Sequence, residues 1–217
     1  MSNPVQISQI NSAFRLEFTD AAVIQAAPEF DVDAWADKAG KIKSKTTSTN
    51  CLGFSAGIDL EKLINYNQDI RHKTNTSRLD EVIDVFDFKP IEFEMRGDQT
   101  FIDDVPKEHY PIVLRYENCS RILDTSAGDY HWLRLNRDGK IYHKRGWFNI
   151  PEVVSEDNGF LAMTEHNNLS KYKFFGGIFA APSTPDIERI EASEGVVDYD
   201  NSNRIRRYIQ NCLQFKG

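Results

Sequence analysis

The sequence predicts an α+β fold, with helices in the first half of the chain and an antiparallel sheet in the second. Between residues 52 and 66 apolar side chains recur at nearly helical spacing, directly after the helix-capping types Ser48, Thr49 and Asn50. From residue 91 onward, short apolar and β-branched runs alternate with turn residues, which is typical of antiparallel strands. Helices that precede a run of strands, instead of alternating with them, define the α+β class.

Length, composition and charge indicate one globular domain without a nucleic-acid partner. The chain has 217 residues, of which 40% are hydrophobic and 27% charged, and we expect a single domain over residues 1–217. Its formal net charge is -7, whereas a sequence-independent nucleic-acid binder needs a cationic surface to neutralise phosphates. The acidic surface suits a basic protein partner instead.

Cysteine content and the N-terminal sequence bear on the compartment. An odd number of cysteines, three in all, predicts reduced thiols instead of a disulfide framework. The first residues lack a basic stretch followed by an apolar run, and no later segment has the length and hydropathy of a membrane span. We therefore expect a cytoplasmic protein, or one secreted by a route that needs no signal peptide.

Local signals predict the elements of the first half in order. Loose apolar alternation over 5–18 favours one or two short strands, and 21–27 favours a short helix that Pro28 ends. Polar residues at about 36–50 predict an exposed loop that leads to Cys51. The segment 79–88 fits either a short helix or a strand.

The helix predicted to follow Cys51, over residues 52–66, contains two glycines. Gly53 and Gly57 each lower intrinsic helix stability by roughly 1 kcal/mol relative to alanine. We expect them to allow close packing of this helix against a neighbouring element, which a sheet would provide.

The second half is predicted to be rich in strands. The expected strands are 91–95, 101–102, 111–116, 130–135, 140–143, 148–150 and 174–179. Gly176 and Gly177 predict a bulge within the last of these strands. Residues 183–195 are expected to form a surface connection, and the chain to end in a helix at about 201–214.

The clearest hairpin surrounds Asn136-Arg137-Asp138-Gly139. Gly139 can adopt the positive φ of a type I turn with a following bulge, which gives a three-residue loop. This loop pairs His143 with Leu133 and so places His143 on the same face as His131. A two-residue loop would place the two histidines on opposite faces.

These residues together predict a nucleophilic site. Cys51 at the start of a helix is favoured as a thiolate by the helix dipole, and a strand residue, His131, would accept its proton. His143 would orient the imidazole of His131, as the third member of a catalytic triad does. The backbone N–H of Cys51 would help to stabilise an oxyanion.

Simpler interpretations exist for each residue. A single cysteine is often a small buried apolar residue, and two histidines in a hairpin can form a cross-strand polar pair. Cys212, within the predicted last helix, is expected to be structural. No CxxC or HxxxH spacing supports zinc, so we expect neither a metal nor a cofactor.

The segment Asn50-Cys51-Leu52-Gly53-Phe54 resembles the Asp-Cys-Ser-Gly-Phe signature of the NlpC/P60 peptidases, which are papain-fold cysteine hydrolases that cleave bacterial cell-wall peptides. The resemblance implies a papain-like fold, with the nucleophile helix packed on an antiparallel sheet. It also implies catalytic roles for Cys51, His131 and His143. Asn replaces Asp before the cysteine, and Leu replaces Ser after it.

The expected function is therefore a cysteine-dependent hydrolase, a peptidase or amidase, that cleaves a peptide or protein amide through a thioester. Without a signal peptide, such an enzyme fits a bacterial effector or toxin, or a cytoplasmic enzyme. Two alternatives stay open. An acyltransferase or transglutaminase-type reaction uses the same residues with an amine in place of water, and a non-catalytic protein-interaction domain can share the fold.

Overall fold

The structure is a computed structural model, in which helices and a mainly antiparallel sheet form an α+β fold, as the sequence predicts. It describes residues 15–16, 21–37, 41, 43, 49–58, 79–96, 99–102, 104–116, 130–144, 149–153, 172, 174–192, 204–205, 207–209 and 211–212.

The main sheet has six strands in the order β2-β9-β5-β6-β7-β8, and every neighbouring pair is antiparallel. Its strands are β2 (Lys89–Pro90), β5 (His109–Tyr116), β6 (Tyr130–Leu135), β7 (Ile141–His143), β8 (Glu152–Val153) and β9 (Phe174–Pro182). The adjacent interior strands β5 and β9 carry continuous buried apolar runs, as expected for strands covered on both faces.

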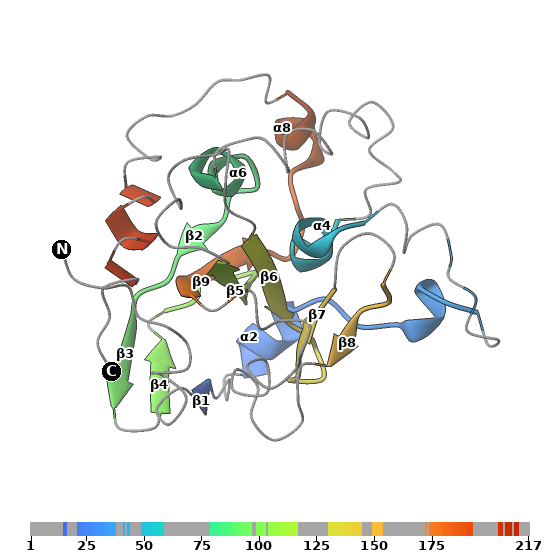
Figure 1. Ribbon diagram of the computed structural model, residues 1–217, viewed down its shortest axis with the longest axis horizontal. Helices are drawn as coiled ribbons and strands as arrows, with labels where there is room; N and C mark the ends of the chain where they lie inside the picture. The colour runs from blue at the N-terminus through green and yellow to red at the C-terminus, as the bar shows by residue number, and fades with distance from the viewer. Residues whose placement is uncertain are drawn as a thin grey trace.

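A second, small sheet has the order β1-β4-β3 (Figure 1). Strand β1 (Arg15–Leu16) pairs in parallel with β4 (Gln99–Ile102), which pairs antiparallel with β3 (Phe93–Arg96). Phe93 packs edge-on against Phe175 of β9, with ring centroids 5.5 Å apart. This contact joins the two sheets.

The helices are short, and among the described residues none is long and apolar enough to cross a bilayer. They are α2 (Ala21–Ala26), the 3-10 helix η1 (Val32–Ala34), α4 (Cys51–Ser55), α6 (Leu79–Val85) and α8 (Ile187–Ala192). Helix α4 lies beside β6 and β7 in Figure 1. The helix predicted over 21–27 is confirmed, and 79–85 is a helix instead of a strand.

Helix α4 is shorter than predicted, because Gly57 ends it. Gly57 has a φ of +69°, its N–H bonds to the Phe54 carbonyl, and the Ile58 N–H bonds to the Gly53 carbonyl. This pair of hydrogen bonds is the Schellman motif, which satisfies the last helical carbonyls. The prediction that the helix continues through 56–58 is wrong, and residues 59–66 lie outside the described part.

Two other predicted elements are corrected. Residues 187–192, assigned to a surface connection, form α8, where the Asp186 carboxylate caps the helix by accepting from the Arg189 N–H at 2.9 Å. The strand predicted at 148–150 is found at Glu152–Val153. Ile150 instead packs against the apolar cluster formed by Trp35, Phe54 and Tyr142.

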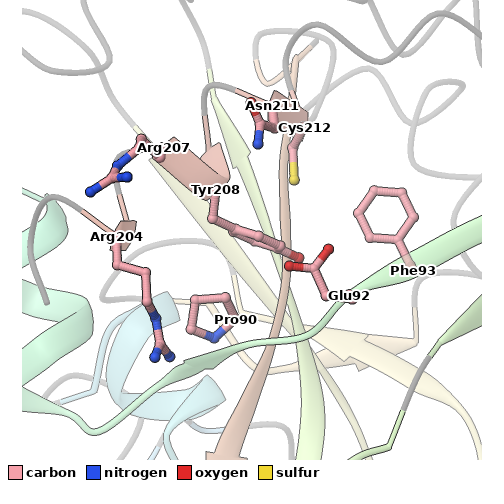
Figure 2. A pocket seen from close by; sticks show the side chains of 8 residues that line it. All are labelled: Pro90, Glu92, Phe93, Arg204, Arg207, Tyr208, Asn211 and Cys212. Carbon is pink, nitrogen blue, oxygen red and sulfur yellow. The ribbon is translucent and has the colours of Figure 1, made fainter.

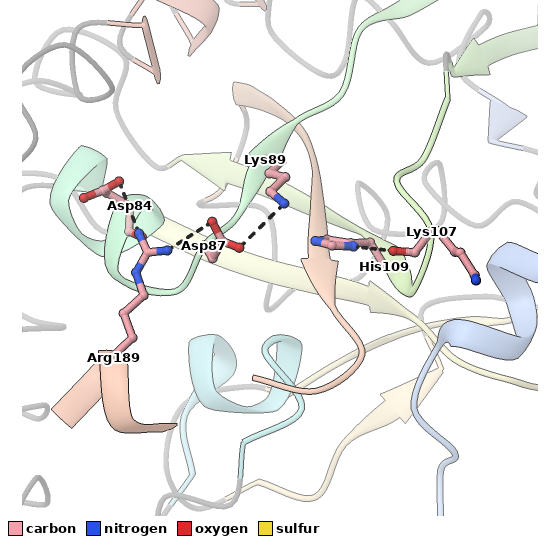
Figure 3. Close-up of polar contacts among 6 residues, drawn as sticks. All are labelled: Asp84, Asp87, Lys89, Lys107, His109 and Arg189. Atoms are coloured by element: carbon pink, nitrogen blue, oxygen red, sulfur yellow. Dashed lines mark hydrogen bonds and ion pairs between the residues drawn. The ribbon is translucent and has the colours of Figure 1, made fainter. Parts of the chain in front are cut away.

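Helix α8 is tied to α6 by an exposed charged network (Figure 3). Arg189 lies 3.6 Å from the Asp84 carboxylate and 3.3 Å from that of Asp87, and Asp87 also faces Lys89 at 3.7 Å. Because these side chains are partly exposed, their ion pairs contribute little to stability. The buried side chain of Ile190 anchors α8 more effectively.

The C-terminal helical segment, residues 204–205, 207–209 and 211–212, packs against β9 and the connection between β2 and β3 (Figure 2). The Tyr208 hydroxyl lies 2.6 Å from the Ile91 carbonyl and accepts from the Ile178 N–H at 3.1 Å. Beside it, Gly177 has a φ of +127°, and the register of β5 and β9 shifts between Leu114 and Arg115. The predicted bulge is confirmed.

Replacing Gly177 with alanine should therefore destabilise the protein strongly. A Cβ atom there would lie 2.5 Å from Cε1 of Tyr208, and the positive φ adds backbone strain. We expect the free energy of unfolding in urea to fall by about 2 to 4 kcal/mol. Gly139→Ala is the matched control: φ is +77° with nothing within 4 Å, so a loss of about 1 kcal/mol is expected. Equal losses would contradict the close contact with Tyr208.

Candidate active site

Cys51 is the first residue of α4, and its side chain is the only partly exposed one in that helix. Asn50 caps the helix, as its residue type predicts, by accepting a hydrogen bond from the Gly53 N–H at 2.9 Å. The N–H groups of the first helical turn have no partner within the helix, so they face the same end as the thiol. This position favours negative charge on the sulfur.

Contacts at the other end of α4 orient it along the β6–β7 hairpin. The Phe54 carbonyl accepts from Nη1 of Arg134 at 2.6 Å, and the Ser55 carbonyl accepts from the Tyr110 hydroxyl at 2.8 Å. Arg134 also donates to Asn136, the residue at which the hairpin turn begins. The C-terminal end of α4 thus lies toward the turn, and Cys51, at its other end, interacts electrostatically with Lys144, the residue after β7.

The hairpin has the predicted three-residue loop. The Asn136 N–H bonds to the Lys140 carbonyl at 2.9 Å, the Gly139 N–H returns to Asn136 at 2.9 Å, and Gly139 has a φ of +77°. The register pairs Leu133 with His143, as the sequence predicts. His131 and His143 consequently share one face of the sheet.

Two buried imidazoles and a partly exposed carboxylate form a polar chain. Nε2 of His131 lies 3.1 Å from Nδ1 of His143, and Nε2 of His143 lies 3.2 Å from the carboxylate of Glu152. Because the carboxylate must accept, a neutral His143 carries its proton on Nε2 and accepts from His131 through Nδ1. His131 then donates through Nε2, which makes Nδ1 its basic nitrogen.

Sequence reasoning missed Glu152. It faces His143 only because β8 pairs with β7 in a register that sets Glu152 opposite His143. No local signal marks this pairing, since it depends on the course of the chain between the two strands. Glu152 holds the orientation of His143, as His143 holds that of His131.

Two further side chains surround His131. The Tyr172 ring stacks on the imidazole, with centroids 5.0 Å apart and planes inclined by 24°. Arg115 pairs with His131 across β5 and β6, and burial lowers the pKa of its guanidinium to about 9.

Lys144 supplies a buried charge on the side of Cys51. Its side chain is fully buried, and Nζ lies 6.0 Å from the ring centroid of Trp35, which itself packs edge-on against Phe54 of α4. Burial lowers the pKa of the Lys144 ammonium to about 8, and the negative charge of Cys51 acts in the opposite direction. A nearby ammonium stabilises a thiolate. The sequence shows that Lys144 directly follows His143, but it does not show that both side chains are buried.

Helix α4 and the two histidines lie on opposite faces of the β6–β7 hairpin. Side chains of a strand alternate, and Arg134 and Tyr142 contact α4, so His131 and His143 lie on the other face. The structure brings the two histidines together and brings Cys51 near Lys144, whereas the pairing of Cys51 with His131 stays a prediction.

The other candidate ligands and thiols are placed differently. Among the described residues, no three side chains of His, Cys, Asp or Glu are arranged to hold a metal ion. Burial raises the pKa of Cys212 to about 12, so that thiol is inert at neutral pH. Cys119 lies outside the described part.

Comparison with known proteins adds no relative. The chain matches no protein-family model, no curated protein and no solved structure.

The lowered pKa of Lys144 predicts a specific pH dependence of stability. The folded state binds this proton with a pKa of about 8 and the unfolded state with one near 10.5, so the penalty of burying the charge applies fully below pH 8. Replacing Lys144 with methionine should raise the free energy of unfolding at pH 7 by up to about 3 kcal/mol. This gain should shrink toward zero as the pH rises to about 10.5.

Urea denaturation between pH 7 and 10 measures this difference. Lys89→Met, which changes a half-exposed lysine, is the control and should show no such pH-dependent gain. A gain for Lys144→Met that stays constant with pH would contradict a buried ammonium.

Proposed function

We propose that the protein is a cysteine-dependent hydrolase of papain-like fold, a peptidase or amidase with Cys51 as nucleophile and His131 as base. The observation that carries the proposal is the chain from the buried His131 and His143 to the partly exposed Glu152, which leaves Nδ1 of His131 as the basic nitrogen. Buried polar chains of this kind are costly unless every member is satisfied. Cys51 interacts electrostatically with Lys144, which directly follows His143 in the sequence.

The reaction balances with these groups alone. The Cys51 sulfur attacks the amide carbonyl carbon while its proton moves to Nδ1 of His131. The imidazolium then protonates the departing amine, the C–N bond breaks, and a thioester forms. Water attacks the thioester as His131 takes its proton, and the returning proton restores the thiol.

His143 and Glu152 are positioning residues in this scheme. When His131 gains a proton, His143 accepts its Nε2–H and the Glu152 carboxylate balances the added charge through His143. The carboxylate does not itself need to be protonated. The Glu152 side chain is 37% accessible, so its carboxylate connects the two buried imidazoles to solvent.

Lys144 and the start of α4 stabilise negative charge. The Cys51 N–H stands at the first helical position and suits the oxyanion of the tetrahedral intermediate. With a pKa of about 8, the Lys144 amine is mostly protonated at neutral pH and favours the thiolate form of Cys51. An acceptor amine in place of water would turn the same steps into acyl transfer.

Alkylation across pH tests the nucleophile. Iodoacetamide, followed by mass spectrometry, should label Cys51 with an apparent pKa below the ordinary thiol value of about 8.5. Cys212 should stay unlabelled because burial raises its pKa to about 12. The variant His131→Ala should bring the labelling of Cys51 back to the ordinary pH range, and the control His109→Gln should leave it unchanged.

Equal labelling of Cys51 and Cys212, or no effect of His131→Ala, would rule out the proposed pair of nucleophile and base. If the variants fold but Cys51 and His131 do not act together, the alternative function, a non-catalytic protein-interaction domain, would be favoured. Circular dichroism of each variant separates loss of reactivity from loss of fold.

Removing the negative charge of Glu152 should lower the alkylation rate of Cys51, but by less than His131→Ala does. In Glu152→Gln the amide is a weaker acceptor and can also donate, so the proton positions on His143 and His131 are no longer fixed. We expect the alkylation rate of Cys51 at pH 7 to fall about tenfold to a hundredfold. Glu188→Gln, an exposed change on α8, is the control. An unchanged rate and pH profile would remove Glu152 from the site.

A further inference from the structure

A second feature of the molecule lies away from α4, between the C-terminal helical segment and the connection from β2 to β3. It is a pocket of about 840 Å³, shown in Figure 2, within the usual size range of small-molecule sites. Its lining residues are Pro90, Glu92, Phe93, Arg204, Arg207, Tyr208, Asn211 and Cys212.

One side of the pocket is cationic. Arg204 and Arg207 stand three positions apart on the helical segment, so both guanidinium groups project from the same side (Figure 2). Both side chains are exposed, and neither forms an ion pair with a carboxylate of the described residues. Guanidinium groups of this kind bind carboxylates through paired N–H donors.

The other side carries the opposite charge. The Glu92 carboxylate lies at the tip of the Tyr208 side chain in Figure 2, and its charge raises the pKa of both Tyr208 and Cys212. Pro90 and Tyr208 offer an apolar surface between the arginines and Glu92, and Phe93 adds a further ring beyond Glu92 (Figure 2). A bound anion would be repelled near Glu92, so the pocket suits a ligand with its two charges at separate ends.

The pocket is not a second nucleophilic centre. Cys212 is buried, and burial raises its pKa to about 12, so a thiolate does not form at neutral pH. The Tyr208 hydroxyl is engaged by the backbone of Ile91 and Ile178. These residues shape a binding surface and supply no reacting group.

We propose that this pocket binds a short peptide as a zwitterion, with its charged termini at the two ends. The ligand carboxylate contacts Arg204 and Arg207, its ammonium contacts Glu92, and an apolar side chain packs against Phe93 and Tyr208. The inference rests on the charges and shape of this pocket and does not depend on the chemistry of Cys51.

Three probes with the same ring test both charges: the peptide Gly-Phe-Gly, its N-acetyl form, which lacks the ammonium, and its C-terminal amide, which lacks the carboxylate. Isothermal titration of the full chain should give an affinity for Gly-Phe-Gly about tenfold higher than for either partial probe, as expected for one added charged hydrogen bond. Arg204→Gln combined with Arg207→Gln should reduce the affinity for Gly-Phe-Gly to that of the amide. Glu92→Gln should reduce it to that of the N-acetyl form.

Arg137→Gln, on the hairpin turn, is the matched control and should leave all three affinities unchanged. Equal affinity for the three probes, absence of binding to the folded wild type, or an equal effect of Arg137→Gln would each overturn the proposal. Iodoacetamide labelling of Cys51 in the Glu92→Gln variant should match the wild type, so failure here is separate from failure of the proposed hydrolase.

Discussion

A buried guanidinium, that of Arg134, joins the helix of the candidate nucleophile to the sheet. Its Nη1 donates to the Phe54 carbonyl at 2.6 Å, its Nε donates to Asn136 at 2.7 Å, and its Cζ lies 3.9 Å from the centroid of the Phe54 ring. Burial lowers its pKa to about 10, so the charge is kept at a desolvation cost that these contacts offset. Because α4 is only five residues long, this anchor sets the position of Cys51.

The hairpin that carries Arg134 also controls the imidazole chain. Its three-residue loop sets Leu133 opposite His143, and a change of one residue in register would move His143 to the face of α4. The pairing of β8 with β7 then adds Glu152. Turn geometry and strand alternation therefore assemble a polar chain from residues that share no local sequence pattern.

Several sequence predictions failed where a local signal had two structural meanings. Gly57 does allow the predicted close packing, since a Cβ there would lie 3.2 Å from the Tyr110 hydroxyl, yet its positive φ also ends α4 earlier than predicted. Asp186 was assigned to a surface connection, yet its carboxylate caps α8. In both cases the residue type was informative about backbone geometry, but the length of the neighbouring helix depended on which carbonyls and N–H groups were buried.

The sequence by itself determined the α+β class, the capped start of α4 at Cys51, the loop length of the β6–β7 hairpin and the shared face of its histidines. These features depend on residue types and on periods of a few residues. Only the tertiary structure decided that Glu152 completes the imidazole chain, that Lys144 is buried near Cys51, and that α4 lies over the opposite face of the hairpin. Such contacts join segments distant along the chain, and their burial follows from packing that no local pattern encodes.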